Sequence, residues 1–118
     1  MTTASERSAT AAAAPTAWSP NVPAVSIVLP VYRNRDSLQE LHHRLVAVLR
    51  SLRLGFELVF VNDACPEGSL TVLQQLARDD PSVVVLALEH NVGQQRAVLA
   101  GLSYARGRYA VVMDADLQ

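Results

Sequence analysis

The stretch FELVFVNDACPEG, residues 56–68, sets the pattern from which the fold follows. Its first six residues are almost all apolar and rich in aromatic and β-branched types, as is typical of a buried strand. Polar residues and turn formers come next, so a loop is expected from Asn62 onward. Three other stretches are short and apolar in the same way, namely residues 25–29, 83–88 and 109–113.

Helical patterns lie between these strands. Ser37 and Glu40 have the form of a capping box, and apolar residues then recur at spacings of three and four, with Gly55 placed to end the helix. Two more helices are expected over residues 70–77 and 94–105. The order β-α-β-α-β-α-β predicts an α/β fold: a Rossmann-like, mostly parallel sheet of about four strands with three helices.

The composition fits one domain without a membrane span. The chain has 118 residues, of which 50% are hydrophobic, and its net charge of −1 gives no reason to expect a nucleic-acid partner. A single cysteine fits a reducing compartment, so we expect a cytoplasmic location. The longest apolar run, residues 83–88, is far shorter than the ~20 residues that span a bilayer. The absence of lysine argues against a receiver domain.

Residues 1–24 differ from the rest of the chain. They are mostly Ala, Thr, Ser and Pro and have no periodic apolar face, so we expect a disordered tail. A signal peptide would need an apolar stretch of roughly 7–15 residues after a basic start. Residues 10–14 are too short and too weakly apolar for that role. The folded domain is therefore expected over residues 25–118.

Ligands of parallel sheets bind beyond the carboxyl ends of the strands. That rule selects residues 30–35, 62–68, 89–93 and 114–118. The first of these segments contains neither a dinucleotide fingerprint nor a Walker lysine motif. Tyr32 offers a flat face for a nucleobase, or it covers the core, and Pro30 shapes the loop or simply ends the strand.

Asp63 follows the second strand directly. Its carboxylate can accept a hydrogen bond from a ring N–H of a base, which would orient a nucleotide without catalysing a reaction. The alternative is an aspartate in a turn that satisfies nearby backbone amides. The local sequence leaves both interpretations open.

The segment after the last strand carries the sharpest chemical signal. Asp114 and Asp116 are two residues apart, so an extended backbone places both carboxylates on one side, where they repel unless a cation lies between them. Mg²⁺ and Mn²⁺ prefer such oxygen ligands, and Gln118 could add a carbonyl oxygen. Haloacid-dehalogenase-type phosphatases also use an Asp-x-Asp motif, but on their first strand, which argues against that chemistry here.

Several motifs together resemble a known family. They are SIVLPVYRN (26–34), residues 56–69, NVGQQRAVLAG (91–101), ARG (105–107) and VMDADLQ (112–118). Residues 25–118 resemble the N-terminal, nucleotide-binding part of family 2 glycosyltransferases with the GT-A fold. The likeness is greatest to the branch that contains dolichol-phosphate mannose synthase and bacterial polyprenyl-phosphate glycosyltransferases.

The resemblance implies a nucleotide-sugar donor, a lipid-phosphate acceptor for the full-length enzyme and a Mg²⁺ or Mn²⁺ cofactor. It implies that Pro30, Tyr32 and Asn34 pack around base and ribose, and that Val61 and Asp63 contact the base. Residues lining the nucleotide and its phosphates would be Met113, Asp114, Ala115 and Asp116. The implied metal ligands are Asp114, Asp116 and Gln118.

Two positions depart from the common family pattern. The usual Asn-Glu after the tyrosine is Arg33-Asn34, which removes a carboxylate near the ribose. The usual Asp-Asp after the second strand is Asn62-Asp63, which keeps the second carboxylate.

Much of the family's length would follow Gln118, including the residues expected to assist acceptor attack. The strand at 109–113, internal in that fold, would then be a bare edge, so the isolated chain is expected to be marginally stable or prone to association. The alternative function is that of a non-catalytic nucleotide-binding fragment or remnant.

Overall fold

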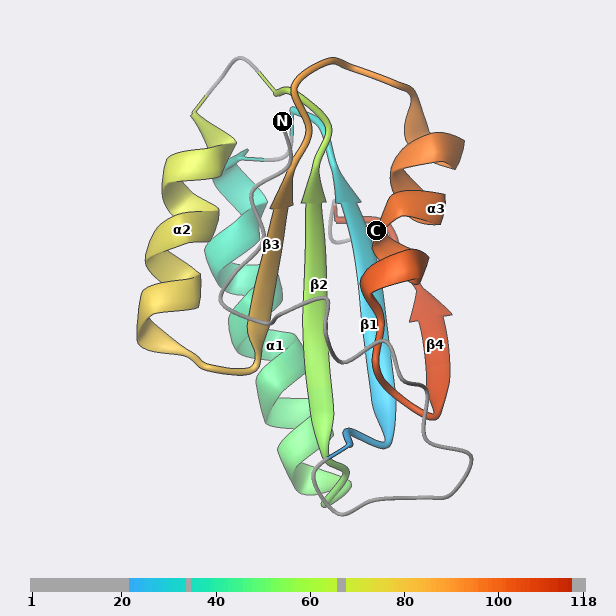
Figure 1. Cartoon of the computed structure of the whole chain (residues 1–118). Helices are drawn as coiled ribbons and strands as arrows, with labels where there is room; N and C mark the ends of the chain where they lie inside the picture. Colours follow the sequence, from blue (N-terminus) through green and yellow to red (C-terminus); the bar gives the residue numbers. More distant parts are fainter. Residues whose placement is uncertain (1–21, 34, 66–67, 116–118) are drawn as a thin grey trace.

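The computed structural model describes residues 22–33, 35–65 and 68–115 (Figure 1). Strands and helices alternate along the chain, with one short 3-10 helix, η2. The elements are β1 Val25–Val31, η2 Arg35–Ser37, α1 Leu38–Ser51, β2 Phe56–Asn62, α2 Ser69–Asp79, β3 Val83–Ala87, α3 Gln94–Tyr104 and β4 Tyr109–Val112. This order confirms the predicted α/β fold.

The four strands form one parallel sheet in the order β3-β2-β1-β4. Helices α1 and α2 cover one face of the sheet and α3 covers the other (Figure 1). Because all strands run the same way, their carboxyl ends share one edge of the sheet. The polar loops that follow β1, β2, β3 and β4 meet at that edge.

Two hydrophobic clusters hold the layers together, one on each face of the sheet. Along β1, Ile27 and Leu29 face α1 and α2, whereas Val28 faces α3, as expected from the two-residue repeat of a strand. Gly101 lets α3 approach the sheet closely, since a Cβ there would lie 2.5 Å from Val28 Cγ1 and 2.9 Å from Val61 Cγ2. The sheet is therefore covered on both sides, and its inner strands are apolar at most positions.

Two predictions about α1 are wrong in detail. Ser37 makes no side-chain capping bond, because its hydroxyl donates to the Ala115 carbonyl at 2.9 Å. The helix ends at Ser51, four residues before Gly55, and Arg53 takes the left-handed turn with φ of 56°. The Gly55 carbonyl instead accepts hydrogen bonds from the backbone amides of Ala24 and Val25.

The predicted tail boundary is also too late. The Ala24 amide donates to Gly55, while the carbonyls of Pro23 and Ala24 accept from Arg108 and Tyr109. Long-range backbone pairing of this kind cannot be read from a local Ala- and Pro-rich composition. The ordered pairing therefore begins before Val25, and residues 1–21 of the expected tail lie outside the described residues.

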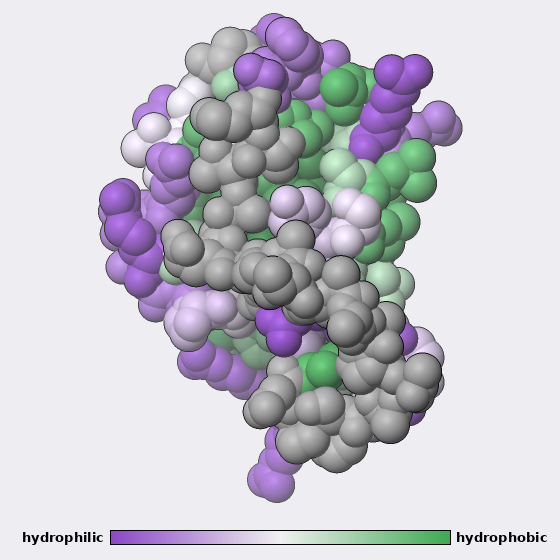
Figure 2. All heavy atoms as spheres, in the orientation of Figure 1, coloured by the Kyte–Doolittle hydropathy of each residue, from purple (hydrophilic) through white to green (hydrophobic). Residues whose placement is uncertain are grey.

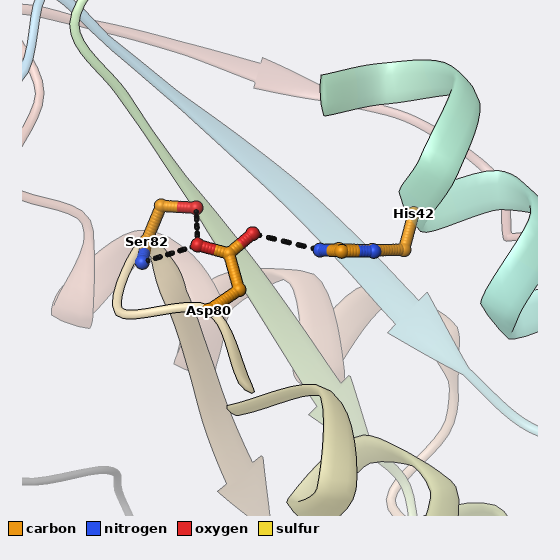
Figure 3. A network of polar contacts seen from close by, with 3 residues as sticks. All are labelled: His42, Asp80 and Ser82. Atoms are coloured by element: carbon orange, nitrogen blue, oxygen red, sulfur yellow. Dashed lines mark hydrogen bonds and ion pairs between the residues drawn. The ribbon is translucent and has the colours of Figure 1, made fainter. Parts of the chain in front are cut away.

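A polar contact joins α1 to the connection between α2 and β3 (Figure 3). Asp80 lies between two partners, with His42 Nε2 2.7 Å from its Oδ2. Its Oδ1 accepts from the backbone amide of Ser82 at 2.9 Å and from the Ser82 hydroxyl at 2.7 Å. These contacts lie away from the carboxyl edge of the sheet and fix α1 against the start of β3.

Strand β4 lies at the edge of the sheet beside β1, and all four of its residues are exposed. Apolar side chains are also exposed on α3, where Figure 2 shows hydrophobic residues gathered on the visible face. This agrees with the expectation of an edge strand. Within the described ranges, no helix combines the length and apolar character needed to cross a membrane.

Candidate functional site

A cleft of about 470 Å³ opens at the carboxyl edge of the sheet. This volume lies in the range of small-molecule sites, roughly 300–1,000 Å³. The cleft receives residues from the loops that follow all of β1, β2, β3 and β4. Its described lining consists of Pro30, Val31, Tyr32, Asp63, Asn91, Gly93, Gln94, Asp114 and Ala115.

The loop after β1 brings an aromatic side chain to the cleft. Tyr32 is 40% exposed, and the Arg33 guanidinium carbon lies 5.3 Å from the centroid of its ring. The Arg33 backbone is held by a hydrogen bond from its amide to Cys65 Sγ at 3.1 Å. The β1 and β2 loops are therefore tied together, and they bring a partly exposed tyrosine ring to the cleft, a group that can pack against a planar ligand.

Asp63 connects the loop after β2 to the loop after β3. Its Oδ1 accepts from the Val92 amide at 2.8 Å, and its Oδ2 accepts from the Gly93 amide and from Asn91 Nδ2, both at 3.1 Å. Asn91 Nδ2 also donates to the Asp63 carbonyl oxygen. Asp63 is only 3% exposed, so these donors compensate a carboxylate that would otherwise be costly to bury. We call these contacts the Asp63 clamp.

Asp114 also lines the cleft, just beyond β4. The Met113 amide donates to Val28 O at 3.0 Å, and the Ala115 carbonyl accepts from Ser37 Oγ. The main chain is thus anchored on both sides of Asp114. The Asp114 side chain is exposed, and its Oδ1 accepts from Gln94 Nε2 at 3.3 Å. A carboxylate oxygen is therefore presented to the cleft from a fixed backbone.

With this geometry established, comparison with known proteins identifies the family. The model of "Glycosyl transferase family 2" matches residues 26–118.

The chain belongs to glycosyl transferase family 2.

Curated relatives within this family include bacterial transferases whose names specify a polyprenyl phosphate. The "Undecaprenyl-phosphate 4-deoxy-4-formamido-L-arabinose transferase" of Pseudomonas fluorescens is 44% identical over 95 residues. That alignment covers 80% of this chain and 28% of the relative. The chain therefore spans little more than a quarter of the length of this glycosyltransferase.

Solved glycosyltransferase structures share the fold. The "Mannosyltransferase PcManGT from Pyrobaculum calidifontis in complex with GDP-Man and Mn2+" superposes with a TM-score of 0.68 at 22% identity, covering 82% of this chain and 28% of that one. "S. aureus TarS 1-349 in complex with UDP" gives a TM-score of 0.65 at 23% identity, covering 78% and 27%. The described α/β unit thus corresponds to part of a GT-A fold.

The structure brings several predicted site residues of this family 2 chain together. Pro30, Tyr32, Asp63, Asp114 and Ala115 all line the cleft.

The remaining predicted residues lie elsewhere. Val61 is fully buried beneath α3, and Met113 packs against the cluster on the α1 and α2 face. Asn34, Asp116 and Gln118 lie outside the described residues.

Four lining residues were not named as site residues from the sequence: Val31, Asn91, Gly93 and Gln94. The strand-end rule selected residues 30–35 and 89–93, so a positional signal existed for the first three. Nothing local distinguished Gln94 from Gln95, because only the orientation of α3 decides which amide reaches the cleft.

The described residues supply part of what a divalent ion needs. Asp114 offers carboxylate oxygens at the cleft, which is the ligand type that Mg²⁺ and Mn²⁺ prefer. Within residues 22–33, 35–65 and 68–115, no group of three His, Cys, Asp or Glu side chains could hold a metal ion. Among the described residues that line the cleft, Asp114 is therefore the one exposed carboxylate whose chemistry suits a divalent ion.

Proposed function

We propose that this chain is the donor-binding part of a glycosyltransferase that moves a sugar from a nucleoside diphosphate sugar to a polyprenyl phosphate. The observation that carries the proposal is the cleft itself. In a family 2 chain, it combines the aromatic ring of Tyr32 with the carboxylate of Asp114 at the carboxyl edge of one parallel sheet. An aromatic ring can pack against a planar base, and a carboxylate can hold a divalent ion that would offset the charge of a diphosphate.

The proposed roles divide the cleft into two ends. Tyr32 and Pro30, together with Asn34, would pack around the base and ribose, and Asp63, which lines the cleft, would lie beside the base. Val61 is buried beneath α3 and could support that end only from below. Asp114 and Ala115 would lie along the diphosphate, and Met113, which packs against the cluster on the α1 and α2 face, would support them.

Asp114, Asp116 and Gln118 would hold the divalent ion. When bound, that ion supplies charge stabilisation for the departing nucleoside diphosphate. The mannosyltransferase of Pyrobaculum calidifontis was solved with GDP-Man and Mn²⁺, which supports Mn²⁺ as the first ion to test. Mg²⁺ has the same preference for oxygen ligands and remains part of the proposal.

The acceptor is proposed from the relatives. The name of the Pseudomonas enzyme specifies undecaprenyl phosphate, and the chain is 44% identical to it over the aligned residues. A lipid acceptor places the full-length enzyme at a membrane face, and the single cysteine of the chain favours the cytoplasmic one. Because the chain spans 28% of that relative, the transfer reaction is proposed for a protein that has the remaining length as well.

Calorimetric titration of the chain with UDP and GDP, each with and without Mn²⁺, tests the donor site. We expect one nucleotide to bind, and Mn²⁺ to tighten its binding. Asp114→Asn should reduce the Mn²⁺ effect, because a neutral amide oxygen attracts a divalent ion less than a carboxylate does. Asp36→Asn, on an exposed residue of η2, is the matched control. If neither UDP nor GDP gave heat of binding, the proposal would be contradicted.

A further inference from the structure

Gln94 and the Asp63 clamp form a continuous connection across the cleft. The clamp fixes the backbone amides of Val92 and Gly93, and Gln94 is the next residue along the chain. The Gln94 side chain then crosses to Asp114, where Nε2 donates to Oδ1 at 3.3 Å. The loop after β2 is thus linked to the segment after β4 through the start of α3.

Each step of this connection restricts the next one. Gly93 has φ of 91°, a conformation that glycine adopts without strain, and its amide is held by Asp63 Oδ2. The first residue of α3 therefore starts from a fixed point. Since Asp114 is exposed, its carboxylate would otherwise sample several rotamers.

We propose that Gln94 is a positioning residue for the Asp114 carboxylate, and that the Asp63 clamp sets the place from which Gln94 acts. This inference rests on the proposed function, because it assigns Asp114 to the diphosphate and metal end of the cleft. It makes Asp63 a residue that couples the base end of the cleft to the metal end. Hydrogen-bond partners of ligating carboxylates commonly tune metal affinity in this way.

The hydrogen bond is tested first without any ligand, by the side-chain amide NMR signals of the chain. Asp114→Asn and Asn91→Ala should each shift the signal of the Gln94 amide group. The Gln95 amide, next in sequence and outside the cleft lining, should move with neither substitution. A Gln94 signal that does not respond to Asp114→Asn would overturn the proposal.

The consequence for binding is tested with Gln94→Met, which keeps the length of the side chain and removes the donor. The measured quantity is the ratio of nucleotide Kd values without and with Mn²⁺, using UDP or GDP, whichever binds. We expect Gln94→Met to lower this ratio roughly tenfold, because the Kd with Mn²⁺ should rise by a larger factor than the metal-free Kd. The matched variant Gln95→Met should behave as the unmodified chain does. A purely structural role would instead change both Kd values together.

The coupling through the clamp is tested with Asn91→Ala alone and combined with Gln94→Met. If both act through Asp114, the double variant should lose no more of the Mn²⁺ effect than Gln94→Met alone. Additive losses would contradict the coupling. If the unmodified chain binds neither nucleotide, the proposed function fails, while the NMR experiment still decides whether the connection exists.

Discussion

At the scale of single residues, Ala64 carries unusual backbone strain. It follows Asp63 directly and has φ of 55°, in the left-handed region that disfavours side chains with a Cβ. We expect Ala64→Gly to raise the free energy of unfolding by about 0.5–1 kcal/mol. Glycine removes the cost of about 1–2 kcal/mol that a residue with a Cβ has in the left-handed conformation. Part of this gain is offset because glycine also increases the conformational entropy of the unfolded chain. Urea unfolding followed by circular dichroism measures the change.

The control for that substitution is an alanine in ordinary helix. Ala47 is exposed within α1, so Ala47→Gly should lower the stability by about 1 kcal/mol. Opposite signs for the two substitutions would show that the backbone conformation at residue 64 decides the outcome. A loss of stability in both would show that Ala64 is not strained in solution.

At the scale of elements, Gly107 sets how β4 meets β1. A Cβ at this position would lie 2.7 Å from the Ser26 amide nitrogen and 2.8 Å from the Val25 carbonyl carbon. Since backbone atoms cannot move aside cheaply, we expect Gly107→Ala to destabilise the fold by about 1–3 kcal/mol. Gly55→Ala is the matched control, because its Cβ would meet nothing closer than 3.7 Å. Equal unfolding midpoints for the two variants would refute the argument.

The contact between α1 and the α2–β3 connection should depend on pH (Figure 3). Burial alone would raise the pKa of the Asp80 carboxyl, but hydrogen bonds from Ser82 and His42 outweigh it, and the pKa falls below its ordinary value of 3.8. A lowered pKa means that the folded state favours the ionised form. The stabilisation is therefore present above pH 3.8 and is lost as the pH falls through the folded-state pKa.

Asp80→Asn tests this dependence. The substitution should lower the urea midpoint at about pH 6, and the difference from the unmodified chain should shrink at about pH 3 and below. Asp79→Asn is the control, because Asp79 is exposed and its carboxylate accepts from Gln75 of the same helix. A difference that stays constant from about pH 6 to about pH 2.5 would show that ionisation of Asp80 does not contribute.

At the scale of the whole molecule, the exposed edge strand controls behaviour in solution. Tyr109 is 68% exposed and Val112 is 45% exposed, and β4 pairs within the described sheet only with β1. Unpaired strand edges with apolar side chains promote association. We therefore expect the 118-residue chain to self-associate as its concentration rises, as measured by sedimentation velocity.

A charge on the edge should reverse this association. Val112→Lys should keep the chain monomeric at higher concentration, since an edge lysine opposes strand pairing. His43→Lys, on the exposed side of α1, serves as the control and should leave the association unchanged. A chain that is monomeric without any substitution, with one sharp unfolding transition, would contradict the expectation.

Much of the architecture could be predicted from the sequence, because strands and helices are marked by patterns among neighbouring residues. The apolar runs that became β1, β2, β3 and β4 and the repeats of three and four in the helices depend only on neighbouring residues. The strand-end rule then placed Tyr32, Asp63 and Asp114 at one edge, and they do line one cleft. The errors fell at boundaries, such as Ser37, whose hydroxyl bonds a residue 78 positions away.

The alternation of elements, the parallel sheet and the family to which the strand-end motifs belong all follow from patterns along the chain. How the site residues are connected depends on the folded arrangement. The Asp63 clamp joins residues 28 to 30 positions apart, and the Gln94 bond to Asp114 spans 20 positions. The pattern of neighbouring residues cannot reveal such partners. Their proximity arises from the order of strands in the sheet and from the way α3 packs on it.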